Sequence, residues 1–120
     1  MPPLYAYALI NFSLFLSLSS AADNSLIDGS WCHYRDVDSS GEIVYPSGNE
    51  YIFKEDGSYT FNGNGEGTGR YLYKYSNGNL EVKFLGSWMS QNLTLENDEM
   101  AWESVKYSGF VMHFKRGKCK

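Results

Sequence analysis

The chain of 120 residues contains two histidines, His33 and His113, which are its best candidates for acid–base or metal chemistry. In extended segments His33 shares a face with Trp31, whereas His113 falls opposite Met112, so the imidazoles should lie on different faces of a sheet. The sequence has no Cys-x-x-Cys, His-Glu-x-x-His, acidic calcium loop or nucleophile elbow. An inward His33 could ligate haem or act as a base, but we favour a histidine satisfied by hydrogen bonds. We predict no catalytic residue, no metal, no cofactor and no enzymatic activity.

A second candidate for chemistry is the glycine-rich stretch FNGNGEGTGRY, residues 61–71, with glycine at positions 63, 65, 67 and 69. A dinucleotide-binding loop needs G-x-G-x-x-G between a strand and a helix, and here Thr68 takes the place of the third glycine. The P-loop form needs Gly-Lys-Ser/Thr, which the sequence lacks. Alternating aromatic residues flank the stretch on both sides. It therefore predicts a hairpin loop, in which glycine permits sharp curvature.

The elements that position these residues are expected to be β-strands. After residue 23, apolar residues alternate with a period of two, and short turn signals interrupt them. Asp56-Gly57 is expected to form a type I′ hairpin turn. We predict an all-β fold, an eight-stranded antiparallel up-and-down barrel closed between its first and last strands. The expected strands are 29–36, 49–55, 58–63, 70–75, 80–86, 88–95, 100–106 and 110–116, with a short extended stretch, 43–45, in the first connection.

The N-terminal stretch LYAYALINFSLFLSLSSAA is apolar and uncharged and ends in small residues, as a secretory signal does before its cleavage site. We predict a signal peptide over residues 1–22 and one domain over residues 23–120. A membrane anchor is the alternative, but Leu4–Leu18 is short for a stable span and rich in Ser and Asn. Export permits a disulfide, and Cys32 and Cys119 allow one intramolecular pairing, worth about 4 kcal/mol. The expected location is secreted or periplasmic; two reduced thiols are the alternative, in a cytosolic protein.

The segment Gly29-Ser30-Trp31, at the start of the first expected strand, resembles the G-x-W motif of lipocalins and related calycin barrels. The run YIFKEDGSYTFNGNGEGTGRY resembles the F-x-x-D-G-x-Y pattern of short bacterial lipocalin-like domains. In that family the tryptophan closes the narrow end of the barrel and a basic residue of the last strand packs across the indole, which assigns these roles to Trp31 and Arg116. The resemblance covers about residues 28–118. The chain lacks the family's second loop motif and C-terminal helix pattern, which implies a shallow cup.

Aromatic residues are abundant, with ten Tyr, seven Phe and three Trp. They either fill the core of a small barrel or line a pocket in which each buried hydroxyl needs a partner. We expect an exported protein that binds a small apolar or amphipathic ligand in the barrel. The alternative is a barrel that binds another protein through loops or surface aromatics, for example as an enzyme inhibitor. The expected ligand-binding residues are Tyr51, Phe53, Tyr59, Phe61, Tyr71, Tyr73, Phe84 and Met112.

Because Trp31 and Arg116 are expected to plug one end, a ligand should enter at the opposite rim, formed by connections 37–49, 62–69, 86–87 and 107–109. Alternation in the sixth strand places Met89, Gln91, Leu93 and Leu95 inside. Asn92-Leu93-Thr94 is a glycosylation sequon that only a eukaryotic host would use, and we favour an ordinary strand segment. The net charge is −4 and both signs are interspersed, which indicates no nucleic-acid partner.

Overall fold

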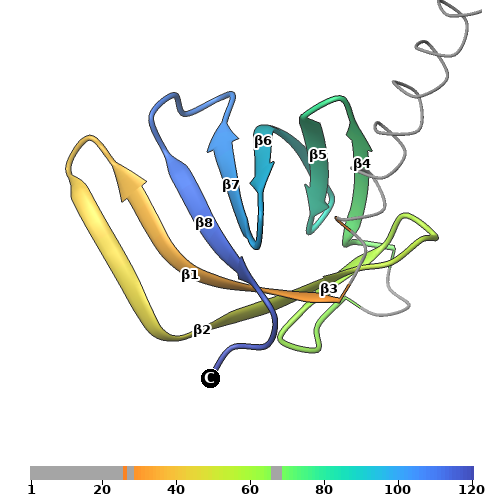
Figure 1. Ribbon diagram of the computed structural model, residues 1–120. Helices are drawn as coiled ribbons and strands as arrows, with labels where there is room; N and C mark the ends of the chain where they lie inside the picture. The colour runs from red at the N-terminus through yellow and green to blue at the C-terminus, as the bar shows by residue number, and fades with distance from the viewer. Residues whose placement is uncertain (1–25, 27–28, 66–68) are drawn as a thin grey trace, which may run out of the picture.

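The computed structural model describes residues 26, 29–65 and 69–120, so the expected signal peptide lies outside the described residues. Eight strands follow one another along the chain, which confirms the all-β prediction (Figure 1). The expected stretch 43–45 is part of a long second strand instead of part of a connection. The strands are β1 Ser30–Asp38, β2 Gly41–Phe53, β3 Tyr59–Phe61, β4 Leu72–Ser76, β5 Asn79–Phe84, β6 Ser87–Glu96, β7 Glu99–Ser104 and β8 Val111–Arg116.

The eight strands form one antiparallel sheet in the order β3-β2-β1-β8-β7-β6-β5-β4, and this sheet curls into a nearly closed barrel. The first and last strands pair as predicted, with Trp31 opposite Arg116 and Val37 opposite Val111. The seam of the barrel falls between the edge strands β3 and β4. Two backbone hydrogen bonds join the edges, from Tyr59 N to the Tyr71 carbonyl (3.0 Å) and from Tyr73 N to the Gly57 carbonyl (2.8 Å).

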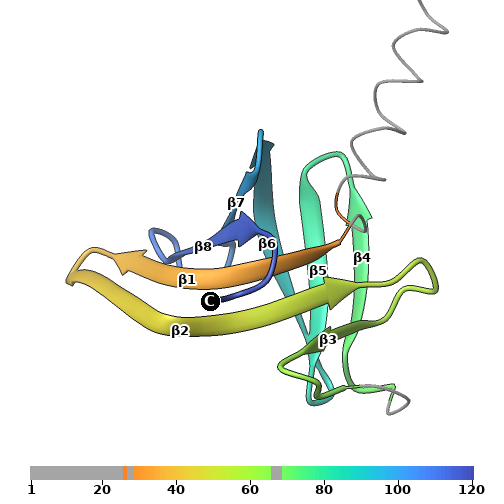
Figure 2. The same cartoon turned by 60° about the horizontal axis from the view of Figure 1, so that its bottom comes forward.

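A large irregularity bends the β1–β2 hairpin, and both views show β2 curving along its length (Figures 1 and 2). The ladder is regular up to the pair His33–Asn49 and resumes at Arg35–Val44, so Tyr34 alone faces residues 45–48. Against β8, His33 pairs with Phe114 and Arg35 with His113, so Tyr34 is an extra residue of β1 there. This extra residue changes which side chains of β1 point inward. Asp36 therefore follows His33 into the interior, where strict alternation would have placed Arg35.

Gly48 allows the bent strand to pass over the disulfide. Its φ is +68°, a left-handed conformation, and a Cβ placed there would lie 2.5 Å from Cys32 Sγ and 2.7 Å from Cys119 Sγ. A side chain is excluded on both counts, because the space is occupied and the backbone angle is one that L-residues rarely adopt.

The tight turns differ in part from their prediction. Gly57 has a positive φ but Asp56 does not, and Gly57 N donates to the Lys54 carbonyl at 3.2 Å. The type I′ prediction for Asp56-Gly57 was wrong, because the turn is centred one residue earlier and uses the glycine as a bulge. Positive φ at both central residues occurs instead at the two-residue connections Asn77-Gly78 and Leu85-Gly86.

The core occupies the half of the barrel around the G-x-W segment. Trp31 is fully buried, and its indole Nε1 donates to the Leu26 carbonyl at 3.1 Å. Trp102 and Phe114 pack with ring centroids 4.4 Å apart above it. Burying such large side chains supplies most of the hydrophobic stabilisation available to a domain of this size. The buried apolar set is Leu26, Trp31, Phe53, Tyr59, Leu80, Val82, Leu93, Met100, Trp102 and Phe114.

Candidate ligand-binding site

One end of the barrel is closed as the sequence predicted. The Arg116 guanidinium lies 4.3 Å from the centroid of the Trp31 ring, a cation–π contact, and Arg116 Nε donates to Asp98 Oδ1 at 3.2 Å. Cys32 and Cys119 form the predicted disulfide across the same β1–β8 seam. We call this end the closed end.

Seven of the eight expected ligand-binding residues form a single packed cluster of rings. Tyr51 contacts Phe53, Tyr59 and Phe61 with ring centroids 5.6–6.4 Å apart. Phe53 and Tyr59 are only 1% and 2% exposed. The structure thus brings these residues together, and they fill the space that they were expected to surround. The seven are Tyr51, Phe53, Tyr59, Phe61, Tyr71, Tyr73 and Phe84, the last through ring contacts with Phe61 and Tyr71.

Two of the four tyrosine hydroxyls of this cluster, those of Tyr59 and Tyr73, have hydrogen-bond partners in the protein. Tyr73 Oη donates to the Lys54 carbonyl at 2.6 Å, and Tyr59 Oη donates to the Lys83 carbonyl at 3.0 Å. Both bonds run between strands on opposite sides of the β3–β4 seam. These two hydroxyls, which could have bound a ligand, therefore help to close the barrel. Burial raises the pKa of both.

A cavity of about 540 Å³ lies beyond the aromatic cluster, at the end of the barrel opposite Trp31. It is bordered by the β1–β2 turn and the connection between β7 and β8, two of the four connections expected at the open rim, and by Met89 and Gln91 of β6. We call this end the mouth. Met112 is the expected ligand-binding residue that reaches it, and the described glycines of the stretch 61–71 do not line it. The lining is Asp38, Ser39, Met89, Gln91, Ser104, Tyr107, Ser108, Phe110 and Met112.

Several mouth residues could have been found from sequence alternation. Met89 and Gln91 were placed inside by the pattern of the sixth strand, and Phe110 shares a face with Met112. Tyr107 and Ser108 belong to a connection that carries no recognisable signal. The tyrosines near the middle of the chain predicted a site in what is the packed cluster, and the pattern there carries no signal for the mouth.

Gln91 is the most informative polar group of the mouth. It is 7% exposed, and within the described part of the chain its side-chain amide forms no hydrogen bond. Ser104 is also buried, but its hydroxyl accepts a hydrogen bond from Tyr107 N at 2.9 Å. The Gln91 side chain lines the cavity, so its amide is available to a ligand or an ordered water there.

A smaller hollow of about 140 Å³ adjoins the mouth and shares Asp38 and Phe110 with it. Asp36, brought inward by the β1 bulge, lines this hollow. Its carboxylate bonds His33 Nε2 at 2.7 Å and accepts from Tyr45 Oη at 2.5 Å. The hydrogen bond to Asp36 raises the pKa of Tyr45.

Tyr51 lies behind this polar group, and burial, with smaller contributions from Asp36 and Tyr45, raises its pKa to about 12. His33 is buried as expected, but only one of its ring nitrogens is satisfied. Nδ1 has no hydrogen-bond partner among the described residues.

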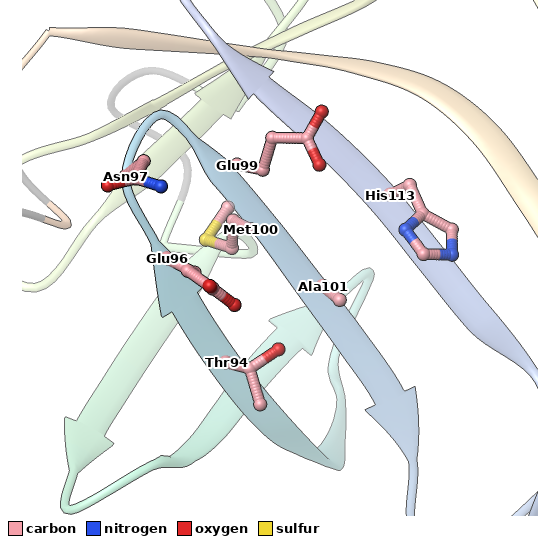
Figure 3. A pocket seen from close by; sticks show the side chains of 7 residues that line it. All are labelled: Thr94, Glu96, Asn97, Glu99, Met100, Ala101 and His113. Atoms are coloured by element: carbon pink, nitrogen blue, oxygen red, sulfur yellow. The ribbon is translucent and has the colours of Figure 1, made fainter.

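A second groove of about 420 Å³ lies on the outer surface over β6, β7 and β8 (Figure 3). Ala101 pairs with Thr94 on one side and with His113 on the other, and its small side chain leaves the groove open between them. Glu96 and Glu99 add carboxylates at its end. Burial and nearby Arg35 lower the pKa of His113, which favours the neutral imidazole. The two histidines thus lie on opposite sides of the sheet, as predicted.

Comparisons with protein-family models, with curated proteins and with solved structures found no match. The nearly closed eight-stranded barrel is consistent with a calycin-like fold. In the described ranges 29–65 and 69–120, no group of three or more His, Cys, Asp or Glu side chains is placed to hold a metal ion. Among the same residues no helix is long and apolar enough to cross a membrane.

Proposed function

We propose that this protein is an exported lipocalin-like binding protein, and not an enzyme, that takes up a small amphipathic ligand at the mouth of its barrel. The observation that carries the proposal is the cavity of about 540 Å³, which has mostly apolar walls and is lined by Gln91, a polar residue that is only 7% exposed. Small-molecule sites typically combine a few hundred Å³ of mostly apolar space with a small number of convergent polar groups.

The composition of the wall suits an amphipathic ligand. Met89, Phe110 and Met112 supply apolar surface, and methionine adapts its shape to irregular ligands. Gln91 offers both a donor and an acceptor in the wall of the cavity. A ligand with an apolar part between Met89 and Met112 and a polar group beside Gln91 would match both the apolar wall and the amide. The packed aromatic cluster would give such a site a rigid base.

The disulfide supports export, since such bonds persist in oxidising compartments. A secreted or periplasmic location after removal of residues 1–22 accords with it. Kinship with lipocalins rests on the G-x-W segment, the contact of Trp31 with Arg116 and the strand order.

The test measures uptake of the neutral dye N-phenyl-1-naphthylamine by fluorescence in wild type and two matched variants. Met89→Glu places a charge on a cavity wall at a residue that is 41% exposed, so the fold should tolerate it. Val105→Glu makes the same change at a rim residue that is 55% exposed and does not line the cavity. We expect dye affinity to fall about tenfold or more in Met89→Glu alone, because a carboxylate is costly to desolvate.

The second candidate function is binding of another protein, and exposed side chains near the rim favour it. Trp88, Val105 and Tyr107 are 41%, 55% and 62% exposed. If dye binding is equal in wild type and Met89→Glu, or is lost equally in both variants, uptake into the mouth is wrong. The exposed rim residues would then be the binding surface.

A further inference from the structure

We infer that the ligand of the mouth is cationic: a protonated amine on a compact apolar body, in preference to a fatty acid or a neutral alcohol. The inference rests on the proposed function and adds the charge of the ligand to it. It comes from the charges that border the mouth and the smaller hollow beside it.

Acidic side chains border both hollows, and no described Lys or Arg lines either one. Asp38 lies on the shared boundary, and Asp36 and Glu42 line the smaller hollow. The charge of Glu42 is neutralised by Arg35, whose Nη1 lies 3.1 Å from Glu42 Oε2. Asp36 is hydrogen-bonded to His33 and Tyr45 instead. Asp38 accepts from the backbone N and the hydroxyl of Ser40, and these bonds hold its pKa below the usual value. Asp38 is therefore a carboxylate at neutral pH.

A polar side chain in the wall of the cavity, that of Gln91, is the independent sign that something polar enters. Gln91 lies on β6, away from the carboxylates of β1, and its amide is unpartnered within the described part of the chain. Its carbonyl oxygen can accept a hydrogen bond from an ammonium group, and its NH2 group can donate to a hydroxyl of the same ligand.

The aromatic and sulfur side chains of the mouth also favour a cation. Phe110 and Tyr107 line the mouth, and the faces of aromatic rings attract cations, while the thioethers of Met89 and Met112 are polarisable. The Lys106 ammonium already lies 5.4 Å from the centroid of the Tyr107 ring, outside the lining of either hollow. A fatty-acid carboxylate would be repelled by the Asp38 carboxylate, and no described Lys or Arg lines the mouth to offset that repulsion.

The test uses three ligands with the same eight-carbon chain: n-octylamine, 1-octanol and octanoate. Each displaces N-phenyl-1-naphthylamine from wild type, from Asp38→Asn and from Glu103→Gln. Glu103 is an exposed carboxylate on the outer face of β7, so Glu103→Gln changes the net charge equally without touching the mouth. Asn at position 38 retains an acceptor for the Ser40 turn.

In wild type we expect octylamine to bind at least about fivefold more tightly than octanol, and octanoate to bind most weakly. Asp38→Asn should remove most of the advantage of the amine, and Glu103→Gln should leave it intact. Raising the salt concentration from 20 mM to 500 mM should weaken octylamine binding and leave octanol binding unchanged, because only the former has a charge interaction to screen.

Different results would overturn the cationic ligand and the mouth as a binding site. Equal binding of octylamine and octanol, a preference for octanoate, or equal losses in both variants overturns the cationic ligand and leaves the mouth as a binding site. Absence of dye binding at any salt concentration overturns the mouth itself, and the charge inference with it.

Discussion

The two halves of this barrel are built on opposite principles. Around Trp31 the interior is filled with rings, and the hydroxyls of Tyr59 and Tyr73 donate to backbone carbonyls. At the mouth a cavity of about 540 Å³ remains, and the side chain of Gln91 lines it. The filled half gains stability from close packing. Among the described residues, buried polar atoms without a partner occur in the filled half, at His33 Nδ1 and Trp102 Nε1, so the two halves differ mainly in how completely side chains fill them.

The largest expected effect concerns the closed end. Replacing both cysteines, Cys32→Ala with Cys119→Ala, frees a loop with a sequence separation of 87 residues. We expect the free energy of unfolding to fall by about 4 kcal/mol in urea titrations, since the disulfide restricts the unfolded chain. Dye affinity at the mouth, measured below the unfolding transition, should change little. A loss of dye binding in protein that is still folded would show that the two halves are not independent.

A second prediction uses alkaline pH to probe the packed cluster. A tyrosine in the unfolded chain ionises near pH 10, whereas the pKa of Tyr51 is raised to about 12. Between these values the unfolded state releases a proton that the native state keeps. The stabilising contribution of neutral Tyr51 is complete below pH 10 and is lost as the pH rises toward 12, by up to about 1.4 kcal/mol per pH unit.

Urea titrations at pH 9, 10 and 11 should therefore show a steeper loss of stability in wild type than in Tyr51→Phe. Tyr107→Phe, at a tyrosine that is 62% exposed, serves as the control and should follow wild type. Parallel curves for wild type and Tyr51→Phe would mean that this hydroxyl is solvated and that the half around it is less completely filled.

A third prediction concerns the seam between β3 and β4. Tyr73→Phe removes the hydrogen bond to the Lys54 carbonyl while the ring stays in the cluster. We expect a loss of about 1 kcal/mol in the free energy of unfolding and no change in dye affinity. A variant of unchanged stability but weaker dye binding would place the ligand in the cluster, as the sequence first suggested.

The smallest expected effect compares two turns of the same geometry. Asn77-Gly78 and Leu85-Gly86 both connect adjacent strands with positive φ at each central residue, 49° at Asn77 and 52° at Leu85. Asparagine tolerates this conformation, whereas leucine is strained in it. Leu85→Asn should raise the unfolding free energy by about 0.5–1 kcal/mol, and Asn77→Leu should lower it by a similar amount. If Leu85→Asn is destabilising, the exposed leucine makes a contact that outweighs its strain.

The filled half, with its closed end, was largely predictable from the sequence, because its determinants are local patterns or pairings with few alternatives. Period-two alternation predicted the strands, and two cysteines allowed one intramolecular pairing. The G-x-W resemblance led from Trp31 to Arg116. Each of these predictions was confirmed by the strand order and by contacts across the β1–β8 seam.

The mouth was harder to predict, for two physical reasons. An extra residue at Tyr34 turns Asp36 inward, and nothing in the alternation of β1 signals that bulge. Whether a tyrosine hydroxyl meets a carbonyl or a ligand depends on residues far away in the chain, as for Tyr73 and Lys54. The expected binding role of the cluster residues stays a prediction, and their close packing directs the search for a ligand toward the mouth.

Methionine methyl NMR tests the central claim most directly, because the described chain holds one methionine in the filled half and two at the mouth. Met100 is 2% exposed in the core, whereas Met89 and Met112 line the cavity. On titration with N-phenyl-1-naphthylamine, the ring current of the dye should shift the methyl signals of Met89 and Met112 and leave that of Met100 in place. A shift of Met100 without shifts of the other two would contradict this account of the two halves.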